Sequence, residues 1–376
     1  MIKFAPPKRG AFIGNKMTRT VFNESNTGHI TKTYPMFFGD SLGLVDTVNV
    51  VNKEIEMLKE KQRGGRWYPT EISLSQDKQD MIKAPKQIVD IMNLAISWQH
   101  TTDSVAGRSI GAMLLPHVTN TEAEGMIGEW SCIEFIHGEA YVHIVKQTRM
   151  NPDQALIDTY KNIRVLARSK KIIDVFNSLY NMSHDLPLRE KKKIMAKALV
   201  TIMAMECISF MSSFGVTFAI AELGYFQGIA ETVSTIARDE LYHGRMSYEL
   251  IKATRYVDGW SDIYDEVLEE CSEIIHSITN GEFAWNDYLF SEGRSLPNLT
   301  KDNLDQLNLY FHNFVCNLIG IKNNFEVVKE HPCKFMDKYI DRSLLQFASQ
   351  EIQHTSYRQG SVVDDLDDDL DLDFNF

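Results

Sequence analysis

Two segments of the sequence carry a glutamate and a histidine at the same short spacing. Glu134 and His137 are three residues apart, and Glu240 and His243 repeat that spacing further along the chain. Residues three apart lie on one face of an α-helix, so each pair would point in one direction from a helix. A single pair is weak evidence. Two such pairs on separate long helices are typical of dinuclear carboxylate sites in four-helix bundles.

A site of that kind needs one further carboxylate from each of the other two helices. Asp103 ends an apolar segment, and Glu206 is the only charged residue in the apolar run 200–221. A buried, unpaired carboxylate is costly, so Glu206 requires either a metal ion or a basic side chain as its partner. Four carboxylates would balance two divalent ions, and two neutral imidazoles would complete the set. Oxygen ligands with imidazole suit iron or manganese.

An oxidisable phenol lies at the right spacing to face this predicted site. Tyr141 follows His137 by four residues, which places it on the same helix face about 6 Å further along the axis. Phe210 and Phe214 follow Glu206 by four and eight residues. Apolar rings around a phenol would protect it from water and reductants. An aromatic residue at helical spacing usually belongs to the core, but the metal pattern favours a functional role here.

Helical spacing of apolar residues dominates the chain, and breakers such as Pro116 and Pro152 separate the helical stretches. No strand-rich region or βαβ alternation is present, so the predicted fold is all-α. The run 200–221 is long enough to cross a membrane, but Glu206 and its hydroxyl residues favour a buried core helix, and we expect no membrane association. The predicted helices cover residues 46–63, 87–105, 120–147, 152–183, 188–222, 226–254, 259–292 and 302–322.

The composition of the chain limits its function and its compartment. The 376 residues are 44% hydrophobic and carry a formal net charge of −12, which argues against nucleic-acid binding. The five cysteines are odd in number, widely spaced and free of any CxxC pair, so we expect neither a disulfide framework nor a zinc site. That usage fits a reducing cytoplasm, and the first residues lack the apolar stretch of a signal peptide.

The composition also divides the chain into three parts. Residues 1–40 are expected to form an irregular arm, residues 41–352 a helical domain, and residues 353–376 a flexible acidic tail. Seven aspartates lie between Asp364 and Asp373, and such a sequence is expected to be disordered in the free protein. Composition alone supports a solubilising tail and a docking peptide equally, because apolar residues interrupt the acidic run at Leu366, Leu370, Leu372, Phe374 and Phe376.

Six motifs occur in order along the chain: PMFFG at 35–39, RWYPTE at 66–71, TDSVAGRS at 102–109, EFIHGEAYVHI at 134–144, ARDELYH at 237–243 and WNDYLF at 285–290. Through them the chain resembles, from about Pro35 to its end, the small subunit of class I ribonucleotide reductases, a family of ferritin-like di-iron carboxylate proteins. Gly138-Glu139-Ala140 departs from the commoner Ser-Arg-Ser of the family. The subclass therefore stays open, as does the choice between a bacterial and a bacteriophage source.

The resemblance implies a ferritin-like helical bundle and a role for each matching residue. Two iron ions would form a di-iron-oxo centre, with manganese as the alternative metal. The implied ligands are Asp103, Glu134 and His137 for the first metal, and Glu206, Glu240 and His243 for the second. Tyr141 matches the tyrosine that is oxidised to a stable radical, and its apolar pocket would be Phe210, Phe214 and Ile236. Trp67 and Asp239 match the residues that link His137 to the subunit surface, and Tyr357 matches a tail tyrosine that relays the radical.

The resemblance also implies partners and an activity. We expect a homodimer in the cytoplasm, or in the host cytoplasm for a bacteriophage protein. Its acidic tail would dock to a large subunit, where ribonucleoside diphosphates become deoxyribonucleotides. Two other functions share the metal pattern. Ferritin-type iron storage would not need Trp67, Tyr357 or the tail, and a di-iron oxidase or desaturase would need a substrate channel and no radical at Tyr141.

Overall fold

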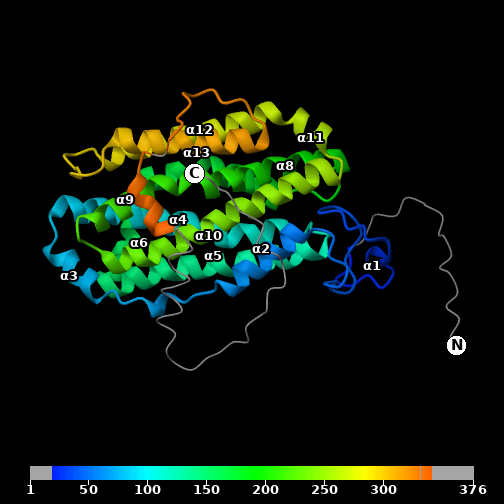
Figure 1. The fold of residues 1–376 in the computed structure, drawn as a ribbon, viewed down its shortest axis with the longest axis horizontal. Coiled ribbons are helices and arrows are strands. Elements are labelled where there is room, and N and C mark those ends of the chain that lie inside the picture. The colour runs from blue at the N-terminus through cyan, green and yellow to red at the C-terminus, as the bar shows by residue number, and fades with distance from the viewer. Residues whose placement is uncertain (1–18, 331, 341–376) are drawn as a thin grey trace, which may run out of the picture.

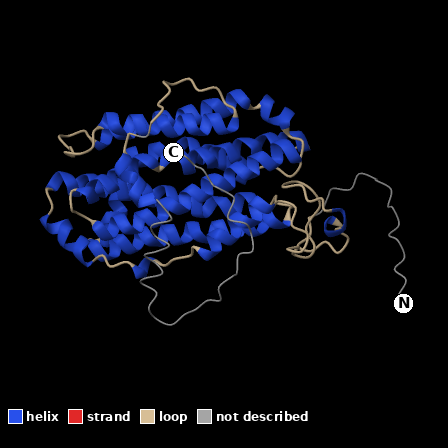
Figure 2. Cartoon of the chain, viewed as in Figure 1, coloured by secondary structure: helices blue, strands red, loops and turns tan. Residues whose placement is uncertain are grey.

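The computed structural model describes residues 19–330 and 332–340, and helices form nearly all of their regular structure (Figure 2). The described residues contain two isolated β-bridges and no β-strand. The longer helices are α2 (Lys53–Gly64), α3 (Ser75–Lys83), α4 (Lys86–Leu114), α5 (Thr121–Thr148), α6 (Pro152–Lys161), α7 (Ile163–Tyr180), α8 (Leu188–Ala204), α9 (Met211–Glu222), α10 (Gln227–Lys252), α12 (Leu268–Leu289) and α13 (Lys301–Ile319). The shorter helical segments are α1 (Gly28–Thr31), η1 (Pro69–Glu71), η2 (Met205–Ser209), η3 (Ala253–Val257), α11 (Ser261–Glu266), η4 (Lys334–Met336) and α14 (Asp337–Ile340).

Four long helical runs form the centre of the molecule. α4 packs along α5 and against α9, and α10 packs against α5, α8 and α9, so the four runs close into a bundle. α12 and α13 cover the α8–α9 side, and α2 and α3 lie against α5 (Figure 1). The predicted all-α helical bundle is therefore confirmed for the described residues.

One of the four central runs is the apolar segment that is long enough to resemble a membrane span. α8, the π-helical turn η2 and α9 follow one another from Leu188 to Glu222, and this run is long and apolar enough to cross a membrane. In its most apolar stretch of 18 residues, 89% of the stretch is buried inside the molecule. The core helix of a large bundle has this property, as the analysis of residues 200–221 predicted.

Two predicted helices are each divided in two. The predicted helix 152–183 breaks at Asn162, because the Asn162 side chain accepts hydrogen bonds from the backbone amides of Arg164 and Val165 and so starts α7. The predicted helix 259–292 is interrupted at Val267, between α11 and α12. Asn favours caps because its side chain competes for backbone hydrogen bonds, and the apolar spacing on both sides concealed that break.

Two further differences concern helix ends, and a third is a helix that was not predicted. The predicted helix 46–63 begins only at Lys53, since Asp46 Oδ1 accepts the amides of Val48 and Asn49 and holds a turn there. α4 continues past residue 105 to Leu114, and the short polar helix α3 was not predicted. The weak apolar pattern of α3, in which the buried residues are aspartates, explains that omission.

The two buried aspartates of α3 define where α10 begins. Asp80 Oδ2 accepts the amide of Phe226, which adopts a left-handed conformation with φ 58°. Asp77 accepts the amides of Gly228 and Ile229 at 3.2 and 2.8 Å. A Cβ at position 228 would lie 2.5 Å from Asp77 Oδ2, so the close approach requires glycine. α3 therefore caps the helix that carries Glu240 and His243.

Parts of the predicted arm and helical domain, and the whole predicted tail, lie outside the described residues. These are residues 1–18 of the arm, residues 331 and 341–352 of the helical domain, and residues 353–376 of the tail, with Tyr357 and the acidic segment.

Candidate metal centre

The two Glu–His pairs meet in the interior of the bundle. Glu134 and His137 project from α5, and Glu240 and His243 project from α10; one ligand atom of each lies within 4.8 Å of the others. His243 Nδ1 is 2.9 Å from Glu134 Oε1 and 2.8 Å from Glu240 Oε2. His137 Nδ1 is 3.2 Å from Glu240 Oε1. All four side chains are fully buried.

The two further carboxylates lie beside this group. Asp103 Oδ1, on α4, is 3.4 Å from His137 Nδ1. Glu206 lies in η2, and the negative charges of Glu240 and Glu134 act on its carboxyl group. Asp103 is 1% exposed and Glu206 is 0% exposed. The structure therefore brings together all six residues that the sequence predicted as ligands, one or two from each run of the central bundle.

Many polar atoms in this group make no hydrogen bond of normal geometry with the described residues, although some lie close to one another. A buried polar atom without a partner is costly, and a cluster of them indicates a missing cation when most are carboxylate oxygens. Carboxylate oxygens and imidazole nitrogens are the ligands that iron and manganese prefer. The residues therefore fit a dinuclear metal centre. The unpartnered atoms are both oxygens of Asp103 and Glu206, Glu134 Oε2, Glu240 Oε1, His137 Nδ1 and His243 Nε2.

The pKa values of these groups reflect their burial first and the crowding of negative charge second. Burial and the nearby carboxylates raise the pKa of Glu206 well above its usual value. Burial and the charge of Glu134 raise the pKa of Glu240 to about 8, and burial raises that of Asp103 to about 6. Two divalent cations would remove this repulsion, because they match the charge of four carboxylates.

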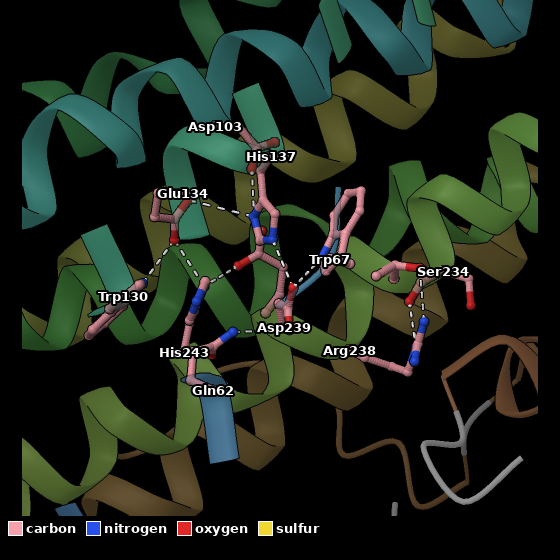
Figure 3. A network of polar contacts seen from close by, with 12 residues as sticks. Gln62, Trp67, Asp103, Trp130, Glu134, His137, Ser234, Arg238, Asp239 and His243 are labelled. Carbon is pink, nitrogen blue, oxygen red and sulfur yellow. Dashed lines mark hydrogen bonds and ion pairs between the residues drawn. The ribbon is translucent and has the colours of Figure 1, made fainter. Parts of the chain in front are cut away.

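A line of hydrogen bonds leads from His137 toward the surface (Figure 3). His137 Nε2 lies 3.2 Å from Asp239 Oδ2, and Trp67 Nε1 donates to the same oxygen at 2.8 Å. Gln62 Nε2 donates to Asp239 Oδ1 at 3.1 Å. Trp67 is 7% exposed, while the adjacent Tyr68 is 56% exposed. The predicted neighbours Trp67, Asp239 and His137 are therefore in direct contact.

Two residues of this region were not identified from the sequence. Trp130 Nε1 donates to Glu134 Oε1 at 2.8 Å, and its ring stacks on that of His243. Trp130 precedes Glu134 by four residues on the same helix, a spacing that could have revealed it. Gln62, at the end of α2, has no comparable signal, because only the packing of α2 against α10 brings it to Asp239.

Tyr141 is completely buried on the same helix as Glu134 and His137. Burial, followed by the negative charge of Asp103, raises the pKa of its phenol well above 10. Its hydroxyl has no hydrogen bond of normal geometry among the described residues, and the ring of His100 lies 6.2 Å from its own. The phenol is therefore protonated and shielded from water.

The three predicted pocket residues share the same apolar core as Tyr141. Phe210 and Phe214 stack with ring centroids 5.5 Å apart, and both are 0% exposed. Ile236, on α10, is also 0% exposed. These side chains belong to the continuous core cluster that contains Tyr141.

A cavity of about 630 Å³ lies between α4, α5 and residues 68–70. Asp103 and Glu134 lie at its inner end. Most of its other lining residues are polar, among them His100, Arg108 and His143. Its size is that of a small-molecule pocket, and it approaches the metal centre from the α4–α5 side.

The chain is similar to known proteins in family, in sequence and in structure. The family model described as ribonucleotide reductase, small chain, matches residues 45–332. The ribonucleoside-diphosphate reductase subunit beta of Buchnera aphidicola subsp. Baizongia pistaciae is 29% identical, and the match covers 94% of this chain and 98% of that one. Subunit beta of reductase 1 from Escherichia coli O157:H7 is 27% identical with the same coverage.

Two solved structures share the fold. The ribonucleotide reductase R2 subunit from Clostridium botulinum superimposes with a TM-score of 0.77 at 19% identity, over 86% of this chain and 98% of that one. The dimanganese(II) protein NrdF of Streptococcus sanguinis gives a TM-score of 0.66 at 17% identity, over 79% of this chain and 99% of that one.

Proposed function

The chain belongs to the family of ribonucleotide reductase small chains, and from that premise we propose that it generates a stable radical at Tyr141 and passes it to a large subunit that reduces ribonucleoside diphosphates. The observation that carries the proposal is the buried group of carboxylates and imidazoles beside a fully buried phenol. The chain would act only together with the large subunit.

The two metals would be held in the sets that the resemblance implied. Asp103, Glu134 and His137 would bind one ion, and Glu206, Glu240 and His243 the other. When bound, the metal pair would supply, with dioxygen, the oxidising equivalent that removes one electron from the Tyr141 phenol. Iron is the proposed metal, and manganese remains the alternative because both suit these ligands.

The surrounding side chains would preserve the radical and orient the ligands. Asp239 fixes the ring of His137 through Nε2, and a carboxylate that contacts the far nitrogen of a metal-binding histidine commonly sets its orientation. Trp130 does the same for Glu134 by donating to Oε1. The apolar core around Tyr141 excludes water and small reductants from the oxidised phenol.

The contacts of Trp67 support a role in moving the radical out. The indole nitrogen and His137 share one oxygen of Asp239, so an electron and a proton can move together along this line. The partly exposed Tyr68 follows directly at the surface. Tyr357 and the acidic tail would continue the path and dock to the large subunit, and the chain would work as a cytoplasmic homodimer.

One observation favours a second candidate, oxidation of a small polar substrate. The cavity beside Asp103 and Glu134 is large enough for such a molecule, and its lining includes the charged or polar side chains of Arg108, His143 and Lys146. An oxidase of this kind would not need Tyr141, so Tyr141→Phe would leave its activity intact. The same substitution would abolish ribonucleotide reduction.

The proposal is tested by reconstitution with the large subunit from the same source. Metal-loaded chain and large subunit together should convert a ribonucleoside diphosphate to its deoxy form, whereas neither should do so alone. No product from the combined subunits, with both metals bound, would contradict the proposal.

A further inference from the structure

A second buried polar cluster lies outside the metal-facing residues, where α4, α7 and α12 meet. Arg168 Nε donates to Glu282 Oε1 at 2.6 Å, and Nη2 contacts Glu282 Oε2, so the pair is bidentate. The guanidinium carbon lies 3.8 Å from the ring centroid of Trp98 and 4.8 Å from that of Trp285. All four residues are 8% exposed or less.

Two donors of this cluster converge on one backbone carbonyl. Arg168 Nη2 donates to Ser209 O at 2.8 Å, and Trp98 Nε1 donates to the same oxygen at 3.2 Å. Hydrogen bonds from a charged donor in a buried site are stronger than neutral ones. Glu282 orients the guanidinium for this contact, so the carbonyl of Ser209 is held by two donors.

Ser209 ends the π-helical turn η2, which carries Glu206. Single π turns are rare and often occur at functional sites, because their wider backbone presents side chains that a regular α-helix would not. Neither carboxylate oxygen of Glu206 has a hydrogen-bond partner among the described residues. The direction of this side chain therefore depends on the backbone of the turn.

We propose that Trp98 and Arg168 are positioning residues for the metal centre, because they hold the carbonyl that ends the π turn and so fix Glu206 toward the ion it shares with Glu240 and His243. The inference rests on the proposed function, since it assigns a role within the same site. Glu282 contributes by orienting Arg168. A purely structural role would instead be to join α7 to α12, which requires the ion pair but no contact with Ser209.

Trp98 and Trp285 provide a matched pair of variants that separates these roles. Both indoles are buried and both lie on Arg168, but Trp285 Nε1 has no hydrogen-bond partner among the described residues. Trp98→Phe therefore removes a donor to Ser209 O, whereas Trp285→Phe removes ring area only. In both variants a phenyl ring remains to pack on the guanidinium.

The experiment is a titration of the full-length, metal-free protein with Mn²⁺ without oxygen, followed by EPR and calorimetry. Trp98→Phe should weaken binding of one of the two ions by roughly tenfold, the size of effect seen when a residue that supports a metal ligand is changed. Trp285→Phe should change the affinity for either ion by less than twofold, which is about 0.4 kcal/mol in binding free energy. Amide hydrogen exchange in the metal-free protein should increase at residues 205–210 in Trp98→Phe alone.

A second variant covers the case in which Trp98→Phe does not fold. The double substitution Arg168→Met with Glu282→Met replaces the ion pair by apolar side chains of similar size and leaves no buried charge unpaired. The double variant should also bind one of the two Mn²⁺ ions roughly tenfold or more weakly. Wild-type affinity for both ions in either folded variant would overturn the inference and leave the proposed function intact. Failure of the wild-type chain to bind two ions would overturn both.

Discussion

Glu206 combines complete burial with the absence of any hydrogen-bond partner for its carboxylate among the described residues. Glu206→Ala should therefore lose one of two metal ions and the radical, because one ion loses an oxygen ligand. Glu222→Ala is the control, since this residue ends α9 and pairs with Lys338 at the other end of the helix. Metal analysis and EPR should find both ions and the radical in the control. Full metal content with normal radical yield in Glu206→Ala would disprove the ligand assignment.

A substitution at Tyr141 separates metal binding from radical storage. Tyr141→Phe keeps the ring but has no phenolic proton, so the variant should bind two ions and consume oxygen yet lose all reductase turnover. Tyr264→Phe is a matched control, because Tyr264 is also buried but hydrogen-bonds to Thr254 on a different part of the fold. Its turnover should be normal. Retained turnover in Tyr141→Phe would place the radical on another residue.

Residue types and spacing predicted the carboxylates and histidines that the structure brings together, whereas Trp67 and Asp239 were assigned only by the resemblance to the family. Glu134, His137, Glu240 and His243 are linked by a repeated spacing, and the isolated charge of Glu206 marked it within an apolar run. The residues that support the ligands through hydrogen bonds were harder to predict from the sequence. Gln62 reaches Asp239 only through the packing of α2 on α10, and no local pattern encodes a contact between such distant segments.

At the scale of elements, α3 determines where α10 starts. Asp77→Ala would leave the buried amides of Gly228 and Ile229 without their acceptor. We expect a loss of about 1–2 kcal/mol in the free energy of unfolding, the usual cost of removing a helix cap. Chemical denaturation of the metal-free protein measures it.

The control for this prediction is Asp77→Asn, which keeps one side-chain oxygen as acceptor and should lose less stability than Asp77→Ala. Both variants should still bind two metals, because Glu240 lies more than three turns from the cap. Equal stability of the wild type and Asp77→Ala would show that the cap does not stabilise α10.

Element types were predicted better than element boundaries. Apolar spacing predicted α5 and α10 within a few residues of their observed ends. The break at Asn162 and the π turn at residues 205–209 were not predicted. At both places the backbone makes hydrogen bonds with side chains, at Asn162 and at Ser209, and the hydrophobic pattern does not encode such contacts.

At the scale of the whole molecule, the tail should have two separable roles. Truncation after Gly360 should weaken binding of the large subunit strongly and leave the Tyr141 radical intact. Each apolar side chain buried on the partner would contribute roughly 1.5–3 kcal/mol before ordering costs are subtracted. The aspartates would mainly speed the approach and make it dependent on salt. Binding titrations at two salt concentrations test this prediction. Unchanged affinity of the truncated chain for the large subunit would show that the tail has no docking role.

Tyr357→Phe addresses the second role of the tail. The substitution keeps the ring but removes the proton that must leave with the electron, so the variant should bind the large subunit almost normally and lose turnover. Activity and binding are measured on the same preparation. Normal turnover would exclude Tyr357 from the radical path while leaving the docking role untouched.

The central claim is that a metal pair in this bundle oxidises Tyr141, and EPR tests it most directly. The metal-free chain is loaded with Fe²⁺ and exposed to oxygen, once with ordinary tyrosine and once with ring-deuterated tyrosine. We predict a stable radical signal whose hyperfine pattern changes on deuteration and which is absent from Tyr141→Phe. A protein that binds two ions yet gives no tyrosyl signal, or one whose signal persists in Tyr141→Phe, would contradict the account.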